Sequence, residues 1–127
     1  MAVDRALADT SLLVARERER SVEAHPEELA VSIVTLAELR LGVLTAEGGT
    51  RARRLRTLIE AERLAPLPVD RLVAQAWAEL VRSLRAAGRR MPVNDSWIAA
   101  TAIAHRLPLV TRDADYDRVP GLDVIRA

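Results

Sequence analysis

The sequence predicts an α/β domain built around a mainly parallel sheet. Short apolar runs of strand length alternate with longer stretches whose apolar residues recur at helical spacing, the pattern of parallel strands joined by helices. The chain has 127 residues and contains no Gly-, Ser- or Pro-rich stretch that would mark a linker. We therefore expect a single domain over residues 1–127, with a sheet of about five strands.

Each expected element is placed by its apolar pattern and its boundary signals. The strands are expected at roughly 5–8, 29–32, 67–69, 108–111 and 122–125. The helices are expected near 11–18, 35–45, 50–64, 70–87 and 95–106. Gly48 and Gly49 separate the second helix from the third, and Thr50 is placed to cap the third. The fourth helix has the clearest amphipathic repeat, with Trp77 expected in the core and Gly88 as the stop signal.

The composition excludes several kinds of chemistry. The absence of cysteine removes disulfides, thiolate zinc sites and cysteine nucleophiles, and it fits a reducing compartment. All 19 basic side chains are arginine, so a mechanism that requires lysine is excluded. The net charge of +1 gives no global attraction to nucleic acid, and two Trp, one Tyr and no Phe offer few rings for base stacking. No signal-peptide pattern and no apolar stretch of membrane-spanning length is present, so we expect a cytoplasmic protein.

Four acidic residues stand at the ends of expected elements, where they can meet. Asp9 and Asp113 come just after the first and fourth strands, Glu38 falls in the first turn of the second helix, and Asp95 begins the fifth. The carboxyl ends of parallel strands share one edge of a sheet, and ligands of α/β sheets bind in the crevice there. We therefore expect these four side chains to converge on one rim.

Converging carboxylates favour a divalent cation. They repel one another and resist ionising together unless a cation compensates their charge. Oxygen ligands without cysteine or histidine favour Mg²⁺ or Mn²⁺ over zinc. Such an ion can lower the pKa of a bound water, orient it in line with a phosphodiester and stabilise charge on the phosphoryl oxygens. The pattern therefore indicates hydrolysis of phosphodiesters.

Each acid also has a structural interpretation, and spacing alone does not choose between the two. Asp9 and Asp95 are good helix N-caps. Thr35 and Glu38 match a capping box, in which the glutamate reaches back to the cap amide. Asp113 can form an Asx turn.

Four local sequences, in order along the chain, resemble the motifs of PIN-domain ribonucleases, in particular the VapC-type toxins of bacterial toxin–antitoxin pairs. They are DTSLL at 9–13, TLAELRLG at 35–42, NDSWIAATA at 94–102 and LVTRDADYD at 109–117. The resemblance extends from about Ala2 to the end of the chain. It implies a three-layer α/β/α PIN-like domain and endonucleolytic cleavage of RNA, which in free toxins stops translation. It also implies Mg²⁺ or Mn²⁺ as cofactor, and its catalytic, metal-holding acids match Asp9, Glu38, Asp95 and Asp113.

The resemblance further implies supporting residues and partners. Thr10, Ser11 and Thr111 match hydroxyl residues that support the metal site, and Asn94 and Asp115 are weaker matches. Family members commonly form homodimers and are neutralised by a small cognate antitoxin that inserts a segment toward the active site. We therefore expect an RNA substrate, an antitoxin and a second copy of the chain as partners.

Some arginines near the expected site are candidates for contact with RNA or with the antitoxin. The candidates are Arg40, Arg51, Arg54 and Arg112. A solvated helix face balanced by Glu60 and Glu62 accounts equally well for the two on the third helix. Arg40 and Arg112 adjoin matched acids, so they can contact a substrate phosphate or simply pair with a carboxylate.

Other phosphate-handling α/β classes fit these residues less well. Receiver domains and haloacid-dehalogenase-like phosphatases need a lysine that this chain lacks, and the Gly-rich turns of nucleotide-binding modules do not occur. Two alternatives stay open. One is a PIN-fold RNA-binding or regulatory module of weak catalytic power that acts through an antitoxin complex. The other is a nuclease that cuts DNA with the same metal chemistry.

Overall fold

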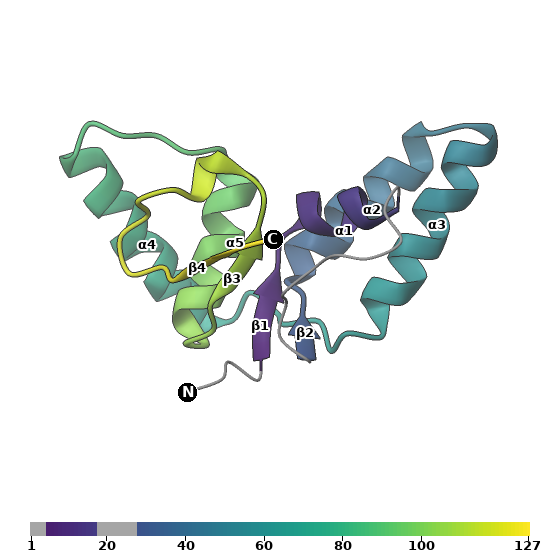
Figure 1. The fold of residues 1–127 in the computed structure, drawn as a ribbon. Coiled ribbons are helices and arrows are strands. Elements are labelled where there is room, and N and C mark those ends of the chain that lie inside the picture. Colours follow the sequence, from purple (N-terminus) through teal and green to yellow (C-terminus); the bar gives the residue numbers. More distant parts are fainter. Residues whose placement is uncertain (1–4, 18–27) are drawn as a thin grey trace.

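The computed structural model describes residues 5–17 and 28–127, which form a parallel four-stranded sheet flanked by helices (Figure 1). The strands are β1 (Arg5–Ala8), β2 (Glu28–Ala30), β3 (Leu109–Thr111) and β4 (Val124–Arg126), in the order β2-β1-β3-β4. The helices are α1 (Thr10–Arg16), α2 (Ile33–Thr45), α3 (Gly48–Glu62), α4 (Arg71–Ala86), α5 (Val93–Ala104) and the short 3₁₀ helix η1 (Ala114–Tyr116). The predicted α/β class with a parallel sheet is confirmed.

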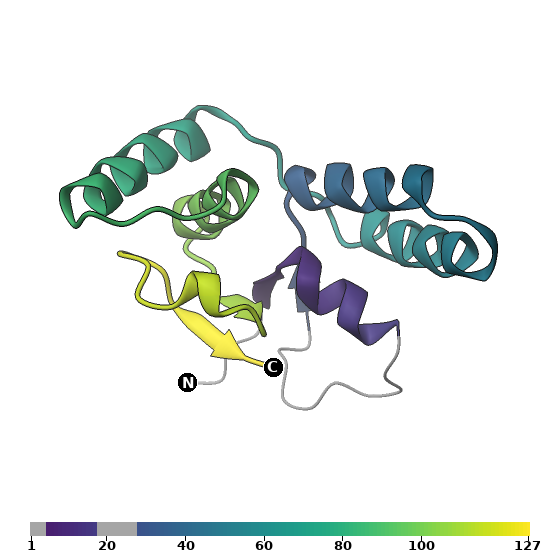
Figure 2. The same cartoon turned by 90° about the horizontal axis from the view of Figure 1, so that it is seen from above.

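Side chains alternate along the strands between two hydrophobic cores. In β1, Ala6 and Ala8 belong to a core shared with α1, α2 and α3, whereas Leu7 belongs to one shared with α4 and α5. All three side chains are fully buried, as the period of two requires in a strand covered on both faces. Figures 1 and 2 show α1, α2 and α3 to one side of the sheet and α4 and α5 to the other. The predicted three-layer arrangement is confirmed. Within the described ranges, none of the helices has both the length and the apolar character needed to span a bilayer.

The sheet has four strands instead of about five because the predicted strand at 67–69 does not form. This segment contributes a single parallel bridge, between Leu67 and Ser32. Pro66 and Pro68 flank Leu67, and a proline has no N–H with which to continue a ladder of hydrogen bonds.

The second helix begins earlier than predicted. Ser32 caps α2, with its hydroxyl oxygen accepting a hydrogen bond from Val34 N–H at 2.9 Å, so the helix starts at Ile33. Thr35 is therefore inside the helix, and Glu38 lies in the second turn instead of the first. The predicted capping box is wrong, which leaves both side chains available for contacts elsewhere.

Two other predicted helix starts are also wrong. The helix α3 begins at Gly48 and has no side-chain cap, and the Thr50 hydroxyl accepts a hydrogen bond from Arg53 instead of capping the helix. The helix α5 begins at Val93, directly after Pro92, so Asp95 lies within the first turn and is not its N-cap.

The end of α4 agrees with the predicted stop signal. Gly88 adopts a left-handed conformation with φ of 67°. Its N–H donates to Arg85 O at 3.0 Å, and the N–H of Arg89 donates to Leu84 O at 2.8 Å, which together form a Schellman motif. Trp77 of the same helix is half-buried and belongs to neither hydrophobic core, so its predicted core position is wrong.

Two glycine substitutions should change stability in opposite directions. Gly88→Ala should lower the free energy of unfolding by about 1 kcal/mol, because a Cβ disfavours the left-handed conformation. Gly49→Ala should raise it by up to about 1 kcal/mol, because Gly49 is helical and its added Cβ would meet only the end of the Arg53 side chain, at 3.8 Å. Urea denaturation measures both, and a shift of the two variants in the same direction would contradict this description of the chain.

Candidate metal centre

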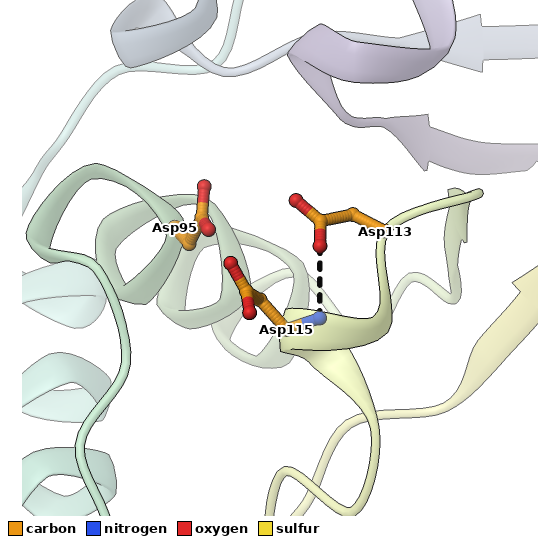
Figure 3. A group of neighbouring side chains, drawn as sticks. All are labelled: Asp95, Asp113 and Asp115. Carbon is orange, nitrogen blue, oxygen red and sulfur yellow. Dashed lines mark hydrogen bonds between the residues drawn. The ribbon is translucent and has the colours of Figure 1, made fainter.

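Three carboxylates gather beyond the carboxyl end of β3 (Figure 3). Asp95, Asp113 and Asp115 each offer one oxygen atom, and these atoms all lie within 4.8 Å of one another. Asp95 comes from the first turn of α5, whereas Asp113 and Asp115 come from the segment that follows β3, and the side chains point toward one another. We call these three residues the acidic cluster.

The segment after β3 is shaped by hydrogen bonds of Asp113 and Thr111. Asp113 Oδ1 accepts a hydrogen bond from Asp115 N–H at 2.8 Å, which is the Asx turn that the sequence allowed. The N–H of Asp113 donates to Thr111 Oγ1 at 2.9 Å. Arg112 between them is exposed. This turn brings the carboxylates of Asp113 and Asp115 to the same place.

Asp9 lies buried beside the acidic cluster, at the end of β1. Its Oδ1 accepts a hydrogen bond from Leu12 N–H at 2.9 Å, so Asp9 caps α1, as its structural interpretation allowed. Its Oδ2 accepts from the hydroxyls of Ser11 at 2.6 Å and Thr111 at 2.8 Å. Burial raises the pKa of Asp9, although these three hydrogen bonds favour its ionised form. The Thr111 hydroxyl therefore links the Asp9 carboxylate to the N–H of Asp113.

Glu38 approaches the same edge from α2. Its Oε1 accepts a hydrogen bond from the Thr10 hydroxyl at 2.7 Å, and the Thr10 and Thr35 hydroxyls share another at 3.0 Å. Its Oε2 accepts from Asn94 Nδ2 at 3.4 Å, which connects Glu38 to the first turn of α5 beside Asp95. The structure thus places Glu38 near the acidic cluster without making it a member.

The charges at this edge act on one another. Burial raises the pKa of Asp95 to about 6. A hydrogen bond donated by the Tyr116 hydroxyl, at 3.1 Å, lowers this pKa, and the negative charges of Asp113, Glu38 and Asp115 raise it. Burial also raises the pKa of Tyr116, which therefore stays a neutral donor. A cation at this edge would relieve the repulsion among the carboxylates.

The acidic cluster has the dimensions of a divalent-cation site. Mg²⁺ and Ca²⁺ bind oxygen at roughly 2.0 to 2.6 Å, so ligands on opposite sides of one ion are about 4 to 5 Å apart. The 4.8 Å limit on the cluster oxygens lies in this range. Asp115, which the sequence suggested only as a supporting residue, lies with Asp95 and Asp113. Sequence spacing could not show that the Asx turn brings Asp115 back toward α5.

Two arginines that the sequence did not indicate bind the segment after β3, which carries Asp113 and Asp115. Arg126 of β4 donates a hydrogen bond to Asp113 O at 3.0 Å and forms an ion pair with the carboxylate of Asp117. Arg89, in the segment before α5, donates to Asp117 O at 2.8 Å and to Arg118 O. An arginine that binds main-chain carbonyl groups has no sequence signature, so neither contact could be predicted.

The candidate arginines of α2 and α3 are partly engaged in ion pairs. Arg40 pairs with Glu62 at 3.4 Å in an exposed position. Arg54 pairs with the largely buried carboxylate of Glu17 at 3.2 Å. Arg51 is exposed, and its side chain makes no hydrogen bond or ion pair with another described residue. Arg40 thus pairs with a carboxylate, as one of its two interpretations allowed, and Arg54 is balanced by Glu17 of the segment after α1 instead of by Glu60 or Glu62.

Comparison with known proteins agrees with the resemblance of the motifs. Residues 6–122 match the family model described as PIN domain. Ribonuclease VapC4 of Mycobacterium tuberculosis is 51% identical over 131 residues, covering 98% of both proteins. Ribonuclease VapC5 of the same organism is 42% identical over 124 residues, covering 93% of this chain and 92% of the relative. A crystal structure of VapBC-5, from the VapBC family of toxin–antitoxin systems of M. tuberculosis, superposes with a TM-score of 0.87 at 40% identity, covering 98% of this chain and 99% of that chain.

The ionisation of Asp95 should depend on Tyr116. Between the ordinary pKa of 3.8 and about 6, the folded protein holds a proton that the unfolded chain has lost, so rising pH lowers the free energy of unfolding in this interval. Tyr116→Phe removes a donor to the carboxylate, and the pKa of Asp95 should therefore rise further. Carboxyl ¹³C NMR on chelator-treated protein measures both values. An equal or lower pKa in the variant would show that the hydroxyl does not stabilise the ionised form.

Proposed function

The chain belongs to the PIN-domain family, and we propose that it is a metal-dependent endoribonuclease that acts as the toxin of a bacterial toxin–antitoxin pair. The acidic cluster is the observation that carries this proposal, because it can hold a divalent cation, and a bound divalent cation can activate water and stabilise charge in the hydrolysis of a phosphodiester. The two VapC ribonucleases match this chain over nearly its whole length, which supports RNA as the substrate.

We propose Mg²⁺ or Mn²⁺ as the cation, because the available donors are all carboxylate oxygens. Asp95, Asp113 and Asp115 would hold it, and Asp9 and Glu38 would complete the acidic edge. When bound, the ion activates a water molecule and stabilises negative charge on the phosphate.

The other residues of the site hold the carboxylates in position and favour their ionised form. Hydroxyl groups of Ser11 and Thr111 donate to Asp9, and Thr10 donates to Glu38. Each such bond stabilises the charged carboxylate, which is the form that binds a metal ion. We infer that these hydroxyls keep the carboxylates ionised and able to bind the cation, although burial favours their protonated form.

The proposed partners follow from the family. The similar crystal structure is of a VapBC toxin–antitoxin system, which supports a small antitoxin as the natural inhibitor. A homodimer and a cytoplasmic location, where the RNA targets of a toxin lie, are part of the same proposal. A binding module with little catalysis is less favoured, because all the matched acids are present and lie along one edge.

The proposal predicts RNA cleavage that depends on both the metal and the acidic cluster. Purified protein should cut RNA with Mn²⁺ or Mg²⁺ and stop when a chelator is added. Asp113→Asn should lower kcat/KM by about a hundredfold or more, since it removes charge that helps to bind an ion worth several kcal/mol in the transition state. Asp123→Asn, which also removes one carboxylate but at an exposed position outside the site, is the matched control.

Two results would contradict the proposal. Cleavage that persists in the chelator would show that no metal is needed, and equal cleavage by the Asp113→Asn and Asp123→Asn variants would show that the acidic cluster is not the active site. A parallel assay with single-stranded DNA tests the remaining alternative, since RNA should be the substrate that is cut.

A further inference from the structure

A pocket of about 450 Å³ lies between α4 and the segment that leads into α5. Trp77, Val81 and Leu84 of α4 and Met91 of the following segment give it an apolar wall. Its size and its aromatic side chain suit a flat organic group such as a nucleobase.

The charge around this pocket is positive. Arg85, Arg89 and Arg90 line it, and no acidic side chain does. Arg85 and Arg90 are exposed, and neither side chain forms a hydrogen bond or ion pair with another described residue. They differ in this from Arg40 and Arg54 on the opposite side of the site, whose charges are already paired. Guanidinium groups of this kind bind phosphate well.

The ring of Trp77 is held in a fixed orientation. It stacks on Trp97 with the ring centroids 4.4 Å apart and an interplanar angle of 5°. Its Nε1–H donates a hydrogen bond to Ser96 Oγ at 2.9 Å, and the Ser96 hydroxyl donates to Val93 O at 2.5 Å. Because the indole is already ordered, a ligand that packs against it pays little of the conformational entropy that binding usually costs.

Two parts of the chain connect the pocket to the acidic cluster. Val93 and Ser96, which line the pocket, flank Asp95 in the first turn of α5. Arg89, which also lines it, binds the carbonyl groups of Asp117 and Arg118, directly after the part of the chain that carries the other two carboxylates. A strand whose phosphate lies at the acidic cluster can therefore place a neighbouring unit in this pocket.

We propose that this pocket binds an unpaired nucleotide next to the scissile phosphate of the RNA, with its base against Trp77 and a phosphate paired with Arg85 and Arg90. This inference rests on the proposed function, because it assumes an RNA strand at the acidic cluster. Aromatic rings combined with unpaired arginines are the elements with which proteins hold single-stranded nucleic acid.

Both tryptophans of the chain are part of this structure, so intrinsic fluorescence reports on the pocket directly. A short single-stranded oligoribonucleotide of mixed sequence, added to chelator-treated protein, should quench the fluorescence as it binds. Arg85→Gln and Arg90→Gln should each weaken binding by about tenfold, as expected for one lost charge-assisted contact. Each should also reduce the slope of log affinity against log salt concentration by about 0.7, the value for one phosphate contact on a single strand.

Arg82→Gln is the matched control, because Arg82 is exposed on the same helix but does not line the pocket. The affinity and salt slope of Arg82→Gln should equal those of the wild type. In the cleavage assay with Mn²⁺, the two pocket variants should raise KM more than they lower kcat.

The proposal is wrong if the pocket variants bind RNA as tightly as Arg82→Gln does. It is also wrong if the tryptophan fluorescence changes with protein concentration and not with added RNA, because the pocket would then be an interface between copies of the chain. If the wild type cleaves RNA and both pocket variants have an unchanged KM, the pocket proposal is rejected and the proposed function stands. Absence of cleavage by the wild type would reject the proposed function instead.

Discussion

The repulsion among carboxylates at the carboxyl edge of the sheet is the constraint around which this structure is organised. Asp9 is 2% exposed, Asp95 is partly buried, and three more acids lie close enough to influence them or their neighbours. Such an arrangement costs free energy unless something opposes the repulsion. Donated hydrogen bonds oppose it in part, and a divalent cation would oppose it more completely.

The surrounding elements can be understood as supports for this edge. The Thr111 hydroxyl connects the ends of the two central strands, β1 and β3, through Asp9 and the N–H of Asp113. Arg126 and Arg89 hold the segment of Asp113 and Asp115 from β4 and from the segment before α5. The carboxylates thus sit on main chain that is fixed from several directions, which is what precise positioning of a metal ion and a substrate phosphate requires.

Much of the fold could be predicted because it depends on patterns local to the sequence. Four of the five apolar runs form strands close to their predicted positions, and Gly88 ends α4. The run at 67–69 fails because of its two prolines. The start of α2 could not be chosen from the sequence, because Ser32 and Thr35 are both good caps whose contributions differ by less than about 1 kcal/mol. The choice depends on contacts with distant parts of the chain, the bridge of Ser32 to Leu67 and the bond of Thr35 to Thr10.

The candidate site shows the same division. The positions of the acids at the strand ends could be predicted, because parallel strands bring their carboxyl ends to one edge of the sheet. The order of the four motifs along the chain indicated the family. The place of Asp115, the bonds from Arg89 and Arg126 to carbonyl groups, and the pocket beside Trp77 depend on how turns bring distant residues together. The few aromatic residues of the chain argued against base stacking by composition, yet the structure stacks both tryptophans on each other where α4 packs against α5.

The central claim is that the acidic cluster holds a divalent cation. Anomalous diffraction from crystals soaked in Mn²⁺ tests it most directly, because the ion is located without reference to activity. We predict a manganese peak among the carboxylate oxygens of Asp95, Asp113 and Asp115. A structure in which Mn²⁺ occupies other sites while these three carboxylates bind none would contradict the account.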